Sequence, residues 1–334
     1  MALELALKVI KNRHPHRTKV IISTYGCRGI FDPVIRAGLQ PVFADIDSEL
    51  NLSGDFVRKL LERHHEAAAI VVPHLCGGAA NAEGLIATAR NKGLVIIEDV
   101  CQSLGAQKDG VSLGSQYDMA IFSFGLGKTI TATSGGILVS RIMEEDLAQE
   151  YQHLQEEDTR IVKRRFWKIL LKYFLKWDLD LNEEILNGHR YCKMHPLDAG
   201  LVTSQLKRLG EIIARQRNHA RGTVVSLKRT GLNFHLQEGE GHIYTKLSLI
   251  FDDDQDRLRL QKALQQASIE TEEMYTPLHT RDFAQGFFNG ENLVNAEKIY
   301  KNVFNIPVRP DLSRRQVDRI KGAIANVNAG RGRS

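Results

Sequence analysis

Up to Ser140 the chain alternates between short apolar runs and stretches in which apolar residues recur every three to four positions. The apolar runs, rich in β-branched residues, predict strands. They lie at Lys19–Ser23, Pro41–Ile46, Ala68–Leu75, Leu94–Val100, Met119–Gly125 and Gly136–Ser140. The intervening stretches predict helices at Asp32–Gly38, Ser53–His64 and Asn81–Lys92. This alternation predicts βαβ units, and therefore an α/β fold with a mostly parallel central sheet flanked by helices.

From Met143 onward the pattern changes to longer, more polar segments. It predicts a polar helix over 143–157, one long helix over 205–232 that Gly231 caps, a strand within 242–251, and helices around 256–269 and 313–327. We therefore expect two domains: a large domain over residues 1–215, and a smaller α+β domain over residues 216–334.

Composition narrows the class of protein. With 43% hydrophobic and 25% charged residues, the chain is neither disordered nor of low complexity. A net charge of +5 is too mild to favour nucleic acid as a partner. The four cysteines are widely spaced without a CxxC pair, which predicts no metal site and favours a reducing, cytoplasmic setting. The first residues form an amphipathic helical pattern with Glu4 and Lys8, unlike a signal peptide.

Candidate chemistry lies in three short segments. Asp99 ends a buried strand in "VIIEDVCQSLGA", and ligands of α/β sheets collect at such strand ends; a helix N-cap or turn is the alternative. Lys128 follows a strand in "DMAIFSFGLGKT", and a lysine there can have its pKa lowered toward roughly 7–8, although an exposed loop lysine is the commoner case. "GLGKT" lacks the spacing of a phosphate-binding P-loop. Gly135 and Gly136 permit a close backbone approach or form an ordinary turn.

These segments, in this order, resemble the DegT/DnrJ/StrS-type sugar aminotransferases. The similarity is carried by Asp99-x-x-Gln102, "GSQYDMAIFSFGLGK" and the following "SGG". It continues in "IRAGLQPVFADID", "VPHLCGGAAN", "YCKMHPLDAGLVTSQLKRLGEIIARQR", "YTPLH" and "NIPVRPDLS". It covers most of the chain except residues 160–186, and implies the fold type I architecture of enzymes that use pyridoxal 5′-phosphate (PLP).

The resemblance also implies roles for individual residues. Lys128 would hold PLP as a Schiff base and move the proton between substrate and cofactor. Asp99 would pair with the pyridinium nitrogen, so that the ring withdraws electrons. Gln102 would lie near the phenolic oxygen or cover a ring face, and Ser123 would contact the phosphate.

Further residues are implied for stacking and for the substrate cleft. Tyr25 matches the aromatic residue that stacks on the cofactor ring, with a plain core tyrosine as the alternative. Three histidines in family-like segments would line the substrate cleft, unless they are structural: His74, His242 and His279.

By resemblance, the reaction would move an amino group from glutamate to a nucleotide-linked keto sugar, for surface polysaccharide or secondary metabolism, in a homodimer. Three features depart from the family. The small-residue turn that cups the PLP phosphate would lie before Met1, an expected asparagine is Tyr191, and the usual "GEGG" is "TSGG". Lys128 argues against related dehydratases, which use histidine there. The alternative is a truncated, non-catalytic member that acts as a binding or scaffold module, associated with a membrane.

The segment Arg160–Trp177, within an insertion at about 160–186, is basic and aromatic. Arg164, Lys168, Lys172 and Lys176 recur every four residues, and apolar residues fill the rest. This pattern is typical of a helix lying on a membrane surface, which predicts peripheral contact with the inner membrane. The alternative is a helix that packs on the body or on a dimer partner while its lysines reach outward.

Overall fold

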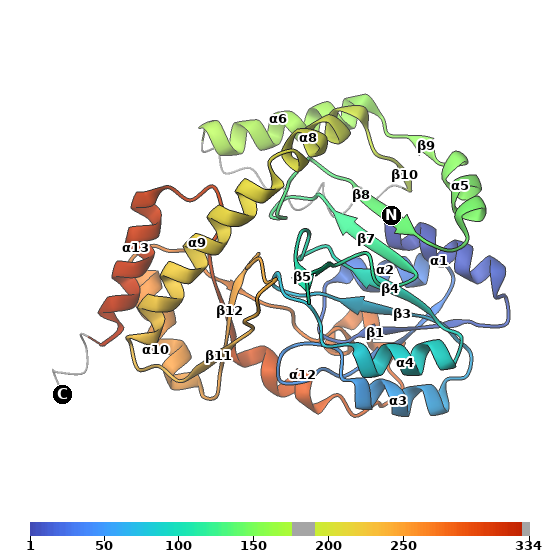
Figure 1. Ribbon diagram of the computed structural model, residues 1–334, viewed down its shortest axis with the longest axis horizontal. Coiled ribbons are helices and arrows are strands. Elements are labelled where there is room, and N and C mark those ends of the chain that lie inside the picture. The colour runs from blue at the N-terminus through green and yellow to red at the C-terminus, as the bar shows by residue number, and fades with distance from the viewer. Residues whose placement is uncertain (176–190, 329–334) are drawn as a thin grey trace.

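A six-stranded sheet forms the centre of the larger part of the molecule in a computed structural model, which describes residues 1–175 and 191–328 (Figure 1). The strand order is β2-β1-β3-β4-β7-β8, and all neighbours are parallel except β7 and β8. The strands are β1 Lys19–Ser23, β2 Gln40–Ala44, β3 Ala67–Pro73, β4 Val95–Asp99, β7 Met119–Ser123 and β8 Gly136–Ser140. This arrangement confirms the mostly parallel α/β sheet predicted from the sequence.

Consecutive residues of the central strands pack against opposite faces of the sheet. Val20 and Ile22 belong to a core shared with the first two helices, whereas Ile21 belongs to a core shared with the next two. Both faces are therefore buried, which explains why these strands read as continuous apolar runs. The helices involved are α1 Ala2–Arg13, α2 Arg28–Arg36, α3 Gly54–Arg63 and α4 Glu83–Asn91.

The smaller part is built on a four-stranded antiparallel sheet in the order β11-β12-β14-β13. Its strands are β11 Phe234–Leu236, β12 Leu247–Phe251, β13 Glu272–Glu273 and β14 Val303–Ile306. Its helices are α10 Asp254–Gln266 and α13 Arg314–Ala325. The short helices α11 Asp282–Gln285 and α12 Val294–Ile299 pack back on the larger part: Ala284 joins the core of α1 and α2, and Asn295 N and Ala296 N donate to Asp45. A third apolar core joins this sheet to α10, α13 and the C-terminal half of α9 (Leu209–Lys228). The predicted domain boundary at residue 215 falls inside α9.

The prediction of one helix over 205–232 is wrong in its continuity. Instead, α8 (Pro196–Leu206) and α9 are separated by a turn at Lys207 and Arg208. The end of α8 is tied elsewhere: the Gln205 side chain accepts a hydrogen bond from Thr131 N (3.0 Å) and donates one to Thr131 O (2.7 Å). This tertiary contact directs α8 toward the loop after β7, whereas α9 packs on the smaller part.

Between β8 and α8 the chain forms α5 Glu144–Gln152 and α6 Thr159–Leu175, and there β9 Gln155–Glu156 pairs with β10 Cys192–Lys193. A second short pair, β5 Gln107–Lys108 with β6 Val111–Ser112, lies between β4 and β7. The predicted helix in the basic segment is confirmed up to Leu175, whereas Lys176, Trp177 and the rest of the predicted insertion lie outside the described residues. Among the described helices, none has the length and apolar character needed to cross a bilayer.

Candidate functional site

The candidate site lies where the parallel strands end. Asp99 is the last residue of β4, and it pairs in register with Ile121 of β7 and with Pro73 of β3. Ser123 is the last residue of β7. Because parallel strands present their carboxyl ends at one edge of the sheet, Asp99 and Ser123 occupy the edge at which α/β proteins bind ligands.

A glycine-rich turn after β7 carries Lys128. Lys128 N donates to Gly125 O (3.3 Å), and Gly127 has a φ of +81°, a conformation that favours glycine. The chain then returns antiparallel as β8. A Cβ atom on Gly136 would lie 2.6 Å from Phe122 O, so the close pairing of β7 and β8 requires glycine at that position. The turn thus holds Lys128 in the loop between the end of β7, which carries Ser123, and the start of β8.

Cys27 and Cys101 both lie within reach of the charges of Asp99 and Lys128. Burial is the main cause that raises the pKa of Cys27; the charge of Asp99 raises this pKa further and that of Lys128 lowers it. The pKa of Cys101 is raised well above its usual value by burial first, and the same two charges act on it in the same directions. Cys27 is nevertheless exposed. The charges of Asp99 and Lys128 thus both reach Cys27 and Cys101, which places these two side chains in the neighbourhood of the same two thiols. We call this region the recess.

Asp99 has a buried carboxylate that is held from its own loop. Its Oδ1 accepts a hydrogen bond from Cys101 N (3.0 Å), and its side chain is largely shielded from solvent. The Ser123 hydroxyl is half-buried and has no hydrogen-bond partner within the part of the chain that the structure describes. The site therefore offers a fixed carboxylate, an amine and a free hydroxyl.

The positive end of α1 lies beside these groups. A Cβ on Gly136 would come within 3.9 Å of Ala2 Cβ, which places the first turn of α1 against the end of the β7–β8 pair. Burial lowers the pKa of the Met1 amine, and Cys101 is among the groups that act on it. The first N–H groups of a helix have no intrahelical acceptor and favour anions. This end of α1 and the Ser123 hydroxyl are therefore suited to a phosphate group.

Gln102 joins three segments at the rim of the site. Its side-chain Oε1 accepts a hydrogen bond from Cys76 N (3.0 Å), and its Nε2 donates one to the Tyr275 hydroxyl. Its backbone carbonyl accepts a hydrogen bond from the Thr245 hydroxyl. Cys76 follows β3, whereas Tyr275 and Thr245 belong to the smaller part. Both polar atoms of the Gln102 amide are thus used within the protein, which favours a role in closing the site over a direct polar contact with a ligand.

Tyr25 is fully buried, and its hydroxyl has no hydrogen-bond partner among the described residues. Its ring lies in an apolar cluster with Leu75 and Met274, and it contacts Tyr275 edge-on with 5.8 Å between ring centroids. These contacts favour the core alternative for Tyr25. Cys27, two residues later, is the residue of this segment that lines the recess. No pattern could have indicated this, because residues 24–26 form an irregular bend without a strand or helix period.

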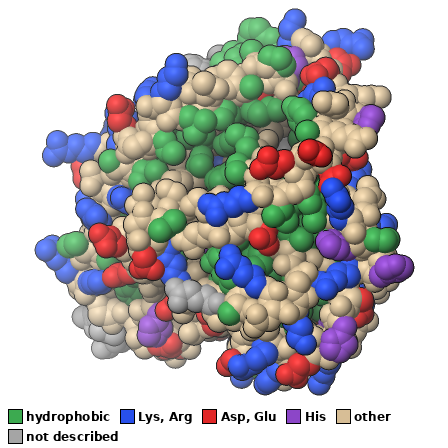
Figure 2. Space-filling model, turned by 45° about the vertical axis from the view of Figure 1, so that its right-hand side comes forward, with side chains coloured by type: hydrophobic (Ala, Val, Ile, Leu, Met, Phe, Trp, Pro, Cys, Tyr) green, Lys and Arg blue, Asp and Glu red, His purple; other side chains and the backbone are tan. Residues whose placement is uncertain are grey.

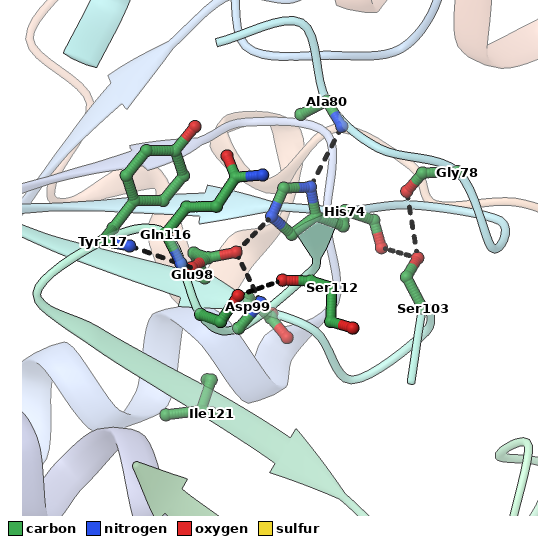
Figure 3. A network of polar contacts seen from close by, with 12 residues as sticks. His74, Gly78, Ala80, Glu98, Asp99, Ser103, Ser112, Gln116, Tyr117 and Ile121 are labelled. Carbon is green, nitrogen blue, oxygen red and sulfur yellow. Dashed lines mark hydrogen bonds and ion pairs between the residues drawn. The ribbon is translucent and has the colours of Figure 1, made fainter. Parts of the chain in front are cut away.

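His74 belongs to a buried network that Figure 3 shows. Its Nδ1 accepts from Ala80 N (3.0 Å), so its Nε2 carries the proton and faces Glu98 Oε2 at 3.2 Å. Glu98 also accepts from backbone N–H groups of the loop before β7, including Gly114 N at 2.7 Å. Burial by itself would raise the pKa of Glu98, but the hydrogen bonds from His74 and Gly114 outweigh it and hold the pKa below its usual value.

This network takes up both ring nitrogens of His74, which favours the structural alternative over contact with substrate. Glu98 precedes Asp99 in β4, and neighbouring residues of a strand point to opposite faces. The network therefore anchors the end of β4 from one face while Asp99 presents its carboxylate from the other. Glu98 was not expected from the sequence to have a role here.

The other two histidines are also held within the protein. His279 Nδ1 lies 2.7 Å from Thr24 Oγ1, and its Nε2 lies 2.9 Å from Glu297 Oε1. His242 Nδ1 accepts from Tyr244 N (2.9 Å), and its Nε2 is buried without a hydrogen-bond partner in the described structure. Burial, followed by the charge of Arg217, lowers the pKa of His242 to about 4. These contacts favour structural roles for both residues.

Two of the departures from the family pattern have visible consequences. The Tyr191 hydroxyl donates to Glu150 Oε1 (2.9 Å), and Lys8 Nζ lies 3.5 Å from the centre of its ring. A Cβ on Gly135, whose φ is +115°, would lie 2.8 Å from Met194 Cε. Gly135 therefore lets the segment after β10 pack directly against the start of β8.

Relatives of the chain are similar over almost its whole length. It is 25% identical to GDP-perosamine synthase from Vibrio cholerae over 312 residues, which cover 92% of this chain and 79% of the relative. It is 26% identical to the spore coat polysaccharide biosynthesis protein SpsC from Bacillus subtilis over 339 residues, which cover 98% and 83% of the two chains.

Solved structures share the fold. The sugar aminotransferase CalS13 from Micromonospora echinospora superposes with a TM-score of 0.76 at 21% identity, over 97% of this chain and 84% of that one. The PLP form of the sugar aminotransferase Spr1654 from Streptococcus pneumoniae gives a TM-score of 0.76 at 20% identity, over 98% and 86%.

A family model matches residues 1–325, which include every element that builds the recess. Its description is the DegT/DnrJ/EryC1/StrS aminotransferase family. The order of strand-end carboxylate, glycine-rich turn and lysine, the fold type I architecture and this match agree: the chain belongs to the DegT/DnrJ/EryC1/StrS aminotransferase family.

Proposed function

We propose that this protein is a PLP-dependent aminotransferase that transfers an amino group from glutamate to a keto sugar carried by a nucleotide. The observation that carries the proposal is that Asp99 ends β4 and Lys128 follows the neighbouring parallel strand β7, with both charges near Cys27 and Cys101. The names of relatives support the substrate class, because they include a GDP-perosamine synthase and a polysaccharide biosynthesis protein.

The residues of the recess fit PLP. The lysine amine, the buried carboxylate and the phosphate-compatible corner at Ser123 and the first turn of α1 match the three functional ends of that cofactor. When bound, PLP supplies a ring that draws electrons from the carbon next to the transferred nitrogen. Ser123 and the first amides of α1 would bind its phosphate, as helix N-termini commonly do.

Asp99 and Lys128 would divide the proton chemistry. The second oxygen of the Asp99 carboxylate would accept the N–H of the pyridine nitrogen and keep that nitrogen protonated, since Oδ1 is already held by Cys101 N. Lys128 would hold the cofactor covalently and, once its amine is free, remove and return the proton at the substrate carbon. The hydrogen bonds that Glu98 accepts from His74 and Gly114 would hold the end of β4, and with it the Asp99 carboxylate, in a fixed position during these proton transfers.

The test is to trap the covalent link. Purified protein is incubated with PLP, reduced with borohydride and digested, and the peptides are analysed by mass spectrometry. We expect the pyridoxyl group on the Lys128 peptide, and an absorption band of the bound cofactor that Lys128→Ala lacks but the surface variant Lys59→Ala retains. A protein that binds no PLP in either the original or the control form would refute the enzyme function and leave a non-catalytic binding module.

The amino donor and the dimer belong to the same proposal. With glutamate as donor, 2-oxoglutarate should be released in the half-reaction that precedes sugar binding. Figure 2 shows hydrophobic side chains gathered around a hollow on one face. Ile137 and Val139 of the edge strand β8 are among the exposed large apolar residues of the described chain. An exposed patch of this kind marks an interaction surface. Sedimentation of the holoenzyme should therefore give the mass of a homodimer.

A further inference from the structure

The helix α6 carries an unusual concentration of positive charge. Its sequence, TRIVKRRFWKILLKYFL, contains six Lys or Arg residues and no Asp or Glu. In Figure 1 it lies along the upper edge of the molecule, outside α8. The reaction proposed above uses none of its residues, so its surface needs a separate explanation.

One side of α6 is fixed to the body of the protein. Val162 is fully buried, and Arg165 pairs with Glu157 (2.6 Å) and lies 3.9 Å from Asp198 of α8. The Asp198 carboxylate in turn accepts from Thr133 N (2.8 Å) and from the Thr133 hydroxyl. These contacts at positions 162 and 165 set the rotation of the helix about its axis.

The opposite side faces solvent. Arg160, Lys163, Arg164 and Trp167 are exposed, and their spacing of three and four residues places them on one face of a helix. The Arg160 side chain is 91% exposed, although it contacts Asp158, and Trp167 is 58% exposed. Trp167 is the most exposed of the large hydrophobic side chains in the described structure.

We propose that this outward face of α6 binds the surface of a lipid bilayer that contains anionic lipid. The charge of this face complements that of an anionic membrane. Arg160, Lys163 and Arg164 lie on one face, and each cation near an anionic surface strengthens the affinity by a similar factor. The tryptophan fits the same partner, because indole prefers the boundary between headgroups and acyl chains. The surface goes beyond the aminotransferase function, since it would hold the enzyme at a membrane without taking part in the reaction.

Flotation with vesicles tests the proposal. The holoenzyme is mixed with vesicles of phosphatidylcholine alone, or of phosphatidylcholine with phosphatidylglycerol, and floated through a density gradient at several salt concentrations. We expect flotation only with the anionic vesicles, decreasing as salt rises, because exposed charges are screened. The double variant Lys163→Glu/Arg164→Glu should partition at least about 30-fold more weakly, which corresponds to the loss of two cations.

A matched control separates this face from overall charge. Arg315 and Arg319 are exposed on α13, one helical turn apart, and Arg315→Glu/Arg319→Glu changes the net charge equally. This control should float like the original protein, and both double variants should keep the same transaminase rate and thermal stability. Equal loss of flotation in the two double variants would overturn the proposal, and so would binding to heparin without binding to anionic vesicles.

Tryptophan fluorescence gives a second readout that does not depend on the charge variants. The chain has two tryptophans, so Trp177→Phe leaves Trp167 as the single emitter. Anionic vesicles should shift its emission to shorter wavelength, and brominated lipids should quench it. An emission spectrum that anionic vesicles leave unchanged would contradict the proposal, whatever the outcome of the PLP experiments.

Discussion

Protonation of His242 should weaken the fold in mild acid. The ring is 5% exposed, its Nδ1 is committed to Tyr244 N, and a Cβ on Gly78 would lie 2.8 Å from its Cδ2. His242 thus packs the smaller part against the loop that follows β3, beside the candidate site. Burial and the charge of Arg217 lower its pKa to about 4 from the usual 6.5 of histidine.

The sign follows from which state binds the proton. Between pH 6.5 and 4 the unfolded chain is protonated at this residue and the folded chain is not, so acidification favours unfolding. Above pH 6.5 the contribution to stability is complete. With a folded pKa of about 4, the linkage relation gives a loss of about 2 kcal/mol at pH 5 and about 3 kcal/mol at pH 4.

The assay is urea unfolding at pH 7.5, 6 and 5, followed by fluorescence. His242→Gln cannot take up this proton, so its stability should fall less steeply over the same range, even if the lost packing lowers it at every pH. At a slope of about 3 kcal/mol per M, the two pH dependences should differ by about 0.7 M in midpoint by pH 5. Replacement of the exposed His16 by Gln should leave the profile unchanged. Parallel curves for the original protein and His242→Gln would refute the reasoning.

Three further predictions concern the end of β4 and the recess. Glu98→Ala removes the acceptor for four N–H donors, of which that of His74 is buried and the three backbone donors are half-buried, so the unfolding free energy should fall by about 3–5 kcal/mol, measured by denaturation. Cys27 should react with iodoacetamide slowly at pH 7 and faster above pH 9, since its pKa is raised. Saturating PLP should protect Cys27 from this labelling, which mass spectrometry measures. Equal labelling with and without PLP would argue against a shared recess. Gly136→Ala should cost about 1–3 kcal/mol and weaken PLP binding, because the new methyl group meets the Phe122 carbonyl, whereas Gly84→Ala meets no atom and serves as the control for both measurements.

The order of elements could be predicted because it depends on local periodicity. Both faces of the central sheet are buried, so β1, β3 and β4 read as unbroken apolar runs, and the helices between them keep a period of about 3.6 residues. Asp99 and Lys128 could be singled out for a similar reason. Asp99 ends a strand and Lys128 follows one, both strands are visible in the sequence, and parallel strands bring such ends to one edge of the sheet.

Only the tertiary structure decided two things. One is the direction of side chains outside helices and strands, and the other is the choice of hydrogen-bond partners that lie far apart in the sequence. Tyr25, in the bend after β1, is buried in the core, whereas Cys27, just before α2, is exposed. His74 is hydrogen-bonded to Glu98, and His279 is hydrogen-bonded to Thr24, which lies 255 residues earlier in the chain. Burial leaves a polar group only the partners that the packed chain brings within hydrogen-bond distance, and residue type alone does not contain that geometry.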